Sequence, residues 1–224
     1  MRAMVRTAGA DDPAERQALL VVDLQNAFCH ERGSVVVRRG PLFGVEAVVA
    51  RVRTALDRAR AAGVPVVFTR QVFRPDGADR GRNFRRRLAD APTALAEGSW
   101  DAELLDGLAA DGDVVVDKCR YDAFLHTSLE VVLHGLGVTE LVVCGVVTNV
   151  CVESTVRSAY MRDFAVTLLG DCCAGRTRRL HEISLEALAA SEFAQVAELE
   201  GGFRFAGAPP AVPATGLGRS REEL

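Results

Sequence analysis

Residues 140–163 read ELVVCGVVTNVCVESTVRSAYMRD, an apolar run followed by a segment of helical period. The apolar run at 141–147 predicts a buried strand, and the apolar residues at helical spacing behind it predict a helix. Thr148 and Asn149 have side chains that can accept hydrogen bonds from the first N–H groups of a helix. Cys151 is therefore expected at the helix start, where backbone N–H groups and the helix dipole lower the pKa of a thiol. Because free cysteines are also common packing residues, position alone leaves both roles open.

The composition is that of a globular protein without a membrane or nucleic-acid partner. The chain has 224 residues, 49% of them hydrophobic, and a formal net charge of −3. This length suits one α/β domain or two small ones, and the charge gives no reason to expect nucleic acid. No apolar run approaches the ~18 residues of a membrane span, and the first residues lack a signal-like apolar stretch, so we expect a cytoplasmic protein. Six cysteines without C-x-x-C spacing indicate reduced thiols.

Strands and helices are expected to alternate along the chain. Short apolar runs predict strands at 18–22, 64–68, 114–116, 141–147 and 164–169, with an edge strand at 193–197. Helical periodicity predicts further helices at 45–62, 100–108, 127–136 and 178–190. This alternation predicts an α/β fold of three αβα layers around a doubly wound, mostly parallel, six-stranded sheet of Rossmann-like type.

The domain organisation is expected to be simple. No linker divides the chain, so a single domain is predicted at 1–205. Residues 206–224 are rich in proline and glycine and have the composition of a flexible tail. Loops are expected at 31–41 and at 69–87, and the second loop is long and carries seven arginines. Loops of this length are usually functional or disordered.

Three side chains with catalytic chemistry follow three of the predicted strands. Asp23 follows the first strand, Lys118 the third, and Cys151 the fourth. Because ligands of doubly wound sheets bind outside the carboxyl ends of the strands, we expect these residues to lie at one edge. A lysine can hold a thiolate and a carboxylate by charge, and the carboxylate can move a proton from the thiol to a leaving nitrogen. A strand-end cap or a surface ion pair remains an alternative role for Asp23 and Lys118.

Three segments resemble the signature blocks of the isochorismatase-like cysteine hydrolases: VVDLQNAF at 21–28, DKCRYDAF at 117–124 and GVVTNVCVESTVRSAYMRD at 145–163. The resemblance covers nearly the whole predicted domain. It implies that Asp23 is the general acid/base, Lys118 the organiser of charge and Cys151 the nucleophile. It also implies a cis peptide between Val146 and Val147, and an oxyanion hole formed by the N–H groups of Val147 and Cys151.

Members of this family differ in their nucleophile and in their metal content. Members that cleave the vinyl ether of isochorismate lack the cysteine, so its presence here implies hydrolysis of a C–N bond through a thioester. Nicotinamidase-type members carry an Asp/His/His metal site after the second strand, and that position here holds no histidine. His30, in the first loop, could approach the site, but one imidazole without partners is a poor metal site. We therefore expect no catalytic metal and no cofactor.

The pattern is nearest to the ureidoacrylate and N-carbamoylsarcosine amidohydrolases. We therefore predict a metal-free amidohydrolase acting on a small ureido, carbamoyl or amide substrate. The resemblance also implies a homodimer or homotetramer. By resemblance to ureidoacrylate amidohydrolase, the substrate contacts are expected to be Phe28, Gln71, Phe73, Asn83, Phe84 and Tyr121. Gln71 and Phe73 replace an asparagine and a tryptophan of that pattern. An amide hydrolase of antibiotic metabolism, similar to streptothricin hydrolase, is an alternative.

Two other classes of function remain open. A doubly wound protein that only binds a nucleotide is one, although no glycine-rich phosphate-binding motif follows any strand. A redox protein is the other, with Cys172 and Cys173 expected after the fifth strand on the same edge as Cys151. The arginines of the long loop either bind a substrate carboxylate or form a solvated face or subunit contact: Arg80, Arg82, Arg85, Arg86 and Arg87. Arg120 lies two residues beyond Lys118 and could reach the pocket.

Overall fold

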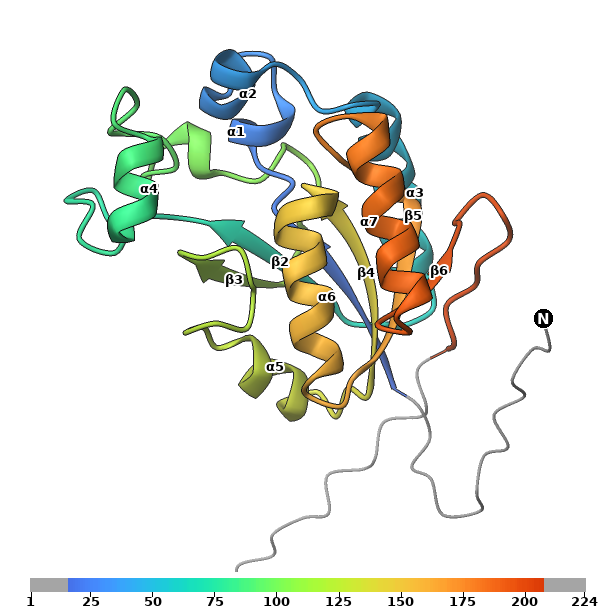
Figure 1. The fold of residues 1–224 in the computed structure, drawn as a ribbon. Helices are drawn as coiled ribbons and strands as arrows, with labels where there is room; N and C mark the ends of the chain where they lie inside the picture. Colours follow the sequence, from blue (N-terminus) through green and yellow to red (C-terminus); the bar gives the residue numbers. More distant parts are fainter. Residues whose placement is uncertain (1–15, 208–224) are drawn as a thin grey trace, which may run out of the picture.

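The computed structural model describes residues 16–207, which form one parallel sheet between two layers of helices (Figure 1). The strands are β1 (Gln17–Val22), β2 (Val66–Gln71), β3 (Val114–Lys118), β4 (Glu140–Val146), β5 (Ala165–Ala174) and β6 (Gln195–Ala197). Their order in the sheet is β3-β2-β1-β4-β5-β6, and all neighbours are parallel. The predicted three-layer, doubly wound fold is confirmed.

Helices cover both faces of this sheet. They are α1 (Asn26–Cys29), α2 (Ser34–Arg39), α3 (Val45–Ala61), α4 (Gly81–Arg87), α5 (Leu129–Gly135), α6 (Glu153–Tyr160) and α7 (Arg178–Ala190). In Figure 1, α6 and α7 lie in front of the sheet and α3 lies behind it. No helix within residues 16–207 is long and apolar enough to cross a membrane.

The switch point of the sheet lies between β1 and β4. From this pair the chain winds outward in opposite directions, to β2 and β3 on one side and to β5 and β6 on the other. The two central strands read as nearly continuous apolar runs because helices bury both of their faces. The loops that follow β1 and β4 therefore open into the crevice where doubly wound sheets bind ligands.

Two predicted loops contain helices, and one predicted helix is nearly absent. The loop expected at 31–41 contains α2, and the arginine-rich loop at 69–87 ends in α4. Both helices have at most seven residues, too few to show an apolar stripe, so periodicity did not reveal them. The helix expected at 100–108 is only a 3₁₀ turn, Trp100–Ala102. Gly107 has a positive φ of 67°, and Leu104 pairs with Gln25 in an isolated bridge, so the chain cannot continue as a helix there.

Two expectations fall at the ends of the chain. The first 15 residues of the predicted domain and nearly all of the predicted tail at 206–224 lie outside the described residues. The domain boundary at 205 therefore stays a prediction.

β5 is longer than expected and includes Cys172 and Cys173, so these two residues lie within the sheet and not beyond its edge.

Gly145 allows β1 and β4 to approach at the switch point. It pairs with Val22, and its φ is +119°. A Cβ atom at this position would lie 2.2 Å from the carbonyl oxygen of Val22. Both the backbone conformation and the space therefore require glycine.

We predict that Gly145→Ala destabilises the protein by more than about 3 kcal/mol, because the strands must separate as well as accept a strained φ. Gly112→Ala is the matched control: its φ is +92°, but nothing lies within 4 Å of the added Cβ. It should cost only about 1–2 kcal/mol. Urea unfolding of both variants tests this, and equal losses would show that the close approach is unimportant.

Candidate active site

The structure brings Asp23, Lys118 and Cys151 together at the carboxyl edge of the sheet. Asp23 directly follows β1, Lys118 is the last residue of β3, and Cys151 lies in a π-helical turn, Thr148–Val152, after β4. Lys118 Nζ is 2.7 Å from Asp23 Oδ2, and both side chains are buried. The charges of Lys118 and Asp23 both shift the pKa of the Cys151 thiol, so the three groups belong to one buried cluster.

Two hydrogen bonds with Thr69 and an unusual backbone conformation hold Asp23 in place. Its second carboxylate oxygen, Oδ1, accepts a hydrogen bond of 2.8 Å from the hydroxyl of Thr69 in β2. Its backbone N–H donates to the carbonyl of Thr69 at 3.1 Å. Its φ of +51° lies in the left-handed region, which is uncommon for a residue with a side chain and is typical of functional positions. The carboxylate therefore has a fixed direction, toward Lys118.

Lys118 carries the positive charge of this cluster. Burial alone would lower the pKa of its ammonium group, but the negative charge of Asp23 and its contact with Cys151 raise the pKa overall. Lys118 Nζ also donates a hydrogen bond of 2.9 Å to the carbonyl of Arg120. Lys118 is therefore charged and fixed in position.

The Cys151 thiol differs from expectation in its protonation. It is 2% exposed, and burial raises its pKa, outweighing the charge of Lys118, which acts to lower it. The prediction of a lowered thiol pKa is therefore wrong.

The cap of the helix was also mispredicted: neither Thr148 nor Asn149 caps the helix through its side chain. The Thr148 hydroxyl is instead hydrogen-bonded to Nδ1 of His181, at 2.9 Å.

A protonated thiol beside a carboxylate still suits nucleophilic chemistry. The proton can pass from sulfur to Asp23 when the sulfur attacks, so a standing thiolate is not required. The expected cis peptide is present between Val146 and Val147. Val147 and Cys151 line the same cavity. That their N–H groups form an oxyanion hole stays a prediction.

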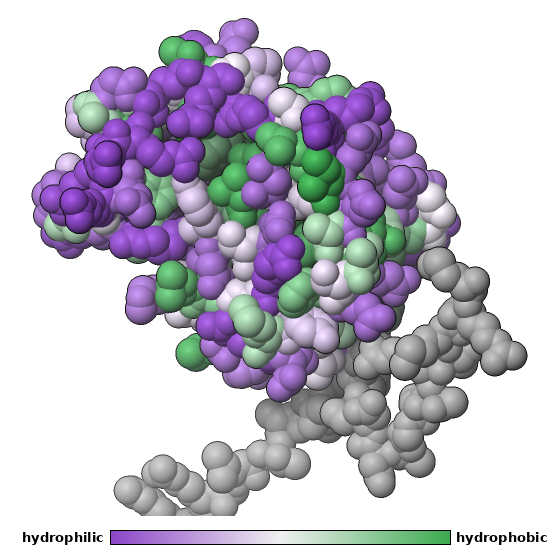
Figure 2. All heavy atoms as spheres, in the orientation of Figure 1, coloured by the Kyte–Doolittle hydropathy of each residue, from purple (hydrophilic) through white to green (hydrophobic). Residues whose placement is uncertain are grey.

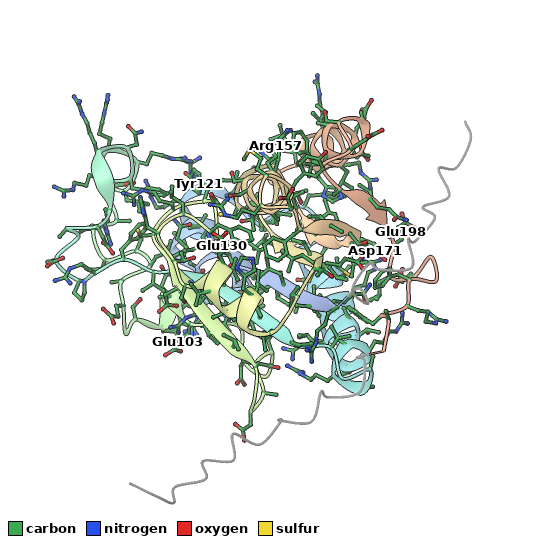
Figure 3. The ribbon with its side chains drawn as sticks, turned by 90° about the horizontal axis from the view of Figure 1, so that it is seen from below. Glu103, Tyr121, Glu130, Arg157, Asp171 and Glu198 are labelled. Carbon is green, nitrogen blue, oxygen red and sulfur yellow. The ribbon has the colours of Figure 1, made fainter. Side chains whose placement is uncertain are left out.

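Cys151 opens onto a cavity of about 290 Å³, the active-site cavity. Figure 2 shows apolar surface gathered in a hollow between the α2–α4 side of the molecule and the upper ends of α6 and α7, with hydrophilic residues around it. Four of the predicted substrate-contacting residues line this cavity: Phe28, Gln71, Phe84 and Tyr121. The rings of Phe84 and Tyr121 meet edge to face at 5.1 Å. Figure 3 shows Tyr121 between α4 and α6.

Two predicted substrate contacts lie elsewhere. Phe73 is fully buried behind Phe84, with 5.2 Å between their ring centroids, and does not line the cavity. Asn83 is exposed on α4. Successive residues of a helix point about 100° apart, so a helix that directs Phe84 inward turns Asn83 away. The resemblance alone did not show that Asn83 and Phe84 lie in a helix.

His30 and Arg120 also lie outside the active-site cavity. The His30 ring packs edge-on against Trp100, with 4.9 Å between centroids. The Arg120 guanidinium donates to the backbone carbonyls of Asp79 and Cys119, which turns it away from Lys118. Neither residue is placed to contact a substrate in this cavity.

Sequence reasoning missed several residues that build the site. Gln25 joins three segments: its amide N–H groups donate to the carbonyls of Gln71 and Ala102, and its oxygen accepts from the N–H of Gln71. Gln25 lies inside the first resembling block, so its place there was a usable signal. Thr69 and the cavity-lining arginines Arg38, Arg39 and Arg176 carried no such signal, because only the fold brings them to the site.

Two polar atoms in the cavity wall lack partners. Among residues 16–207, neither the amide nitrogen of Gln71 nor the side-chain oxygen of Asn149 has a hydrogen-bond partner, although both atoms are buried. Both residues line the active-site cavity. Because buried polar atoms are normally paired, this donor and this acceptor are available to a ligand.

The described residues do not form a metal centre. Across 16–207, no three His, Cys, Asp or Glu side chains are grouped so that they could hold a metal ion. A metal-free mechanism stays a prediction.

The match to a known domain agrees with this geometry. The isochorismatase domain family matches residues 17–201. The chain belongs to the isochorismatase family. The resemblance seen in the sequence, and the hydrolase that it implied, are thereby confirmed.

Individual relatives support the same assignment. The chain is 35% identical over 172 residues to the ureidoacrylate amidohydrolase RutB of Stutzerimonas stutzeri, covering 70% of this chain and 69% of the relative. It is 37% identical over 174 residues to the RutB of Methylobacterium radiotolerans, covering 71% and 67%. A solved cysteine hydrolase from Pseudomonas syringae pv. phaseolicola superposes with a TM-score of 0.74 at 33% identity, covering 82% of this chain and 88% of that one.

We predict that Lys118→Met destabilises the protein by about 3–5 kcal/mol, because it leaves the Asp23 carboxylate buried and unpaired. Most of this loss should be recovered in the double variant Asp23→Asn, Lys118→Met, which has no buried charge to stabilise. Arg70→Met is the control, since the Arg70–Asp117 pair of 2.8 Å is partly exposed and should contribute at most about 1 kcal/mol. Denaturant unfolding of the three variants measures this, and a double variant as unstable as Lys118→Met would contradict it.

Proposed function

We propose that the protein is a cysteine amidohydrolase that cleaves a C–N bond of a small ureido, carbamoyl or amide compound. The observation that carries the proposal is the buried Asp23–Lys118 ion pair, whose charges act on the buried Cys151 in the wall of the active-site cavity. The relatives named ureidoacrylate amidohydrolase support the choice of a C–N bond.

The first step forms a thioester. Cys151 Sγ attacks the carbonyl carbon while its proton passes to the Asp23 carboxylate. Because burial raises the pKa of the thiol, the sulfur keeps its proton until it attacks, and the negative charge then develops on the carbonyl oxygen as the C–S bond forms. Lys118 stays protonated and offsets the charge that moves between sulfur and carboxylate.

The carbonyl oxygen becomes an oxyanion in this step. The backbone N–H groups of Val147 and Cys151 are proposed to receive it, in the manner of an oxyanion hole. When the tetrahedral intermediate collapses, the C–N bond breaks and Asp23 returns its proton to the leaving nitrogen. An amine or ammonia departs, and an acyl group remains on sulfur.

Water completes the reaction. Asp23, again a carboxylate, takes a proton from a water molecule that attacks the thioester carbonyl. The C–S bond breaks, and the proton returns from Asp23 to Cys151. One water has then been consumed, and the acid and the amine have been released.

The unpartnered atoms of the wall suit a carbamoyl or amide group. The Gln71 amide nitrogen can donate to a carbonyl oxygen, and the Asn149 oxygen can accept from an amide N–H. Together they would orient the group to be cleaved over Cys151.

We predict that Cys151→Ser lowers turnover by at least about a thousand-fold, because an alcohol beside Asp23 is a far weaker nucleophile than the thiol. The panel consists of N-carbamoyl amino acids, ureidoacrylate and simple primary amides, and the measurement is ammonia or amine release. Mass spectrometry after rapid acid quench should show the acyl group on Cys151 of the wild type.

Cys119→Ser is the matched control, because Cys119 is half-buried and lies outside the active-site cavity. It should keep wild-type turnover. Unchanged hydrolysis by a folded Cys151→Ser variant would remove the proposed mechanism, and no hydrolysis of any compound by the wild type would remove the proposed substrate class.

A further inference from the structure

Four arginines line the active-site cavity, and no acidic residue lines it. Arg38 and Arg39 come from α2, Arg87 from the end of α4, and Arg176 from the loop between β5 and α7. Three segments that are far apart in the sequence therefore bring positive charge to one opening. Such a concentration of one sign over a low-dielectric cavity attracts ligands of the opposite charge.

The charges of three of these arginines converge. Burial lowers the pKa of Arg176, and the charges of Arg39 and Arg87 lower it further. Like charges that are close enough to affect one another destabilise the unliganded site. An anion bound among them would relieve this repulsion.

Within the described part of the chain, the charges of Arg39, Arg87 and Arg176 have no acidic partner. Arg38 forms an ion pair with Asp90 and is thereby neutralised. Arg87 donates to the hydroxyl of Tyr121, and Arg176 donates at 2.8 Å to the carbonyl of Gly40, both of which are neutral acceptors. Within residues 16–207, no carboxylate is paired with Arg39, Arg87 or Arg176. We call these three residues the arginine rim.

The rest of the cavity is different in character. Near Cys151 the wall offers the unpartnered Gln71 amide and Asn149 oxygen, and Phe28, Leu95 and Phe84 supply apolar surface. The cavity thus has a floor suited to a neutral amide group and a rim suited to an anion. A ligand of about 290 Å³ would reach both.

We propose that the arginine rim selects substrates that carry at least two negative charges, as two carboxylates or one phosphate, on the part of the molecule remote from the bond to be cleaved. That the bound anion is part of a substrate rests on the proposed amidohydrolase function. The existence of the anion site does not. Guanidinium groups bind carboxylate and phosphate oxygens in pairs, so three of them can hold two anionic groups.

The anion site can be tested without hydrolysis, by alkylating Cys151 with iodoacetate and with iodoacetamide. The first reagent is anionic and the second neutral, and both react with the same thiolate, so the ratio of their rates does not depend on the thiol pKa. We expect this ratio to be about ten-fold higher for Cys151 than for N-acetylcysteine amide, because the positive charge of the arginine rim raises the local concentration of the anionic reagent. Peptide mapping by mass spectrometry follows Cys151 among the six thiols.

Substitutions assign the effect to the rim. Arg39→Met and Arg176→Met should each lower the ratio by about two- to three-fold, since each removes one of the three charges. Arg176 is half-buried, so its variant is checked for folding by circular dichroism, while Arg39 is exposed and its loss should leave the fold intact. Arg86→Met is the matched control, because Arg86 is exposed on α4 beside Arg87 but does not line the cavity. A ratio near that of the free thiol, or equal losses in Arg86→Met, would overturn the proposal.

The number of charges is tested with four-carbon probes of one chain length. At constant ionic strength, succinate should raise the melting temperature more than butyrate, and 1-butanol should have no effect. Inorganic phosphate in place of succinate shows whether the rim favours phosphate or carboxylates. Equal shifts with succinate and butyrate would reduce the rim to a site for a single charge and overturn the proposal as stated.

Turnover then separates this proposal from the proposed function. Among N-carbamoyl compounds, kcat/KM should rise from the neutral N-carbamoylglycinamide to N-carbamoylglycine and to N-carbamoylaspartate. If no compound is hydrolysed but the alkylation ratio and the melting shifts are as expected, the amidohydrolase function fails and the anion site stands. If all three are hydrolysed equally, the rim does not select substrates and the proposal fails while the function stands.

Discussion

The ion pair between Lys118 and Asp23 is the interaction on which the site depends. It joins the ends of β3 and β1 across the intervening β2, and it is completely enclosed. Two charges withdrawn from water are stable only with good geometry and further hydrogen bonds, which Thr69 and the carbonyl of Arg120 provide. The same enclosure raises the pKa of Cys151 and keeps its proton on the sulfur. The pKa of Lys118 and the pKa of Cys151 are thus both raised within one desolvated cluster.

Much of the fold could be predicted because the central strands are buried on both faces. β1 and β4 are unbroken apolar runs, and α3 and α7 have clear helical periods, so their positions were evident from residue types alone. The short polar helices α2 and α4 could not be predicted in this way, since their side chains mostly face solvent. Their positions are set by contacts with distant segments, such as the pairing of Arg38 with Asp90.

The site was predictable to a similar extent. Asp23, Lys118 and Cys151 follow strands whose carboxyl ends share one edge, so the rule for doubly wound sheets brought them together. The protonation of Cys151 was not predictable, because it depends on how completely the cavity wall excludes water. Asn83 and Phe73 were expected to contact a substrate, but neither lines the cavity: Asn83 is exposed on α4, and Phe73 is buried after the end of β2. Arg87 was among the loop arginines considered for binding a carboxylate, whereas Arg39 and Arg176 were missed because only the fold brings their separate segments to the cavity.

The position of α4 has a consequence for how such a protein can change. This seven-residue helix carries Phe84 in the cavity wall and Arg87 at the rim, whereas the reactive residues are held by the sheet and the turn after β4. The residues proposed to break the bond and those proposed to select the ligand thus belong to separate parts of the chain. Replacement of one small peripheral segment could redirect the protein to a new compound while the core stays untouched. New specificity would in that case arise through substitutions in α4, while the residues proposed to carry the reaction stay unchanged.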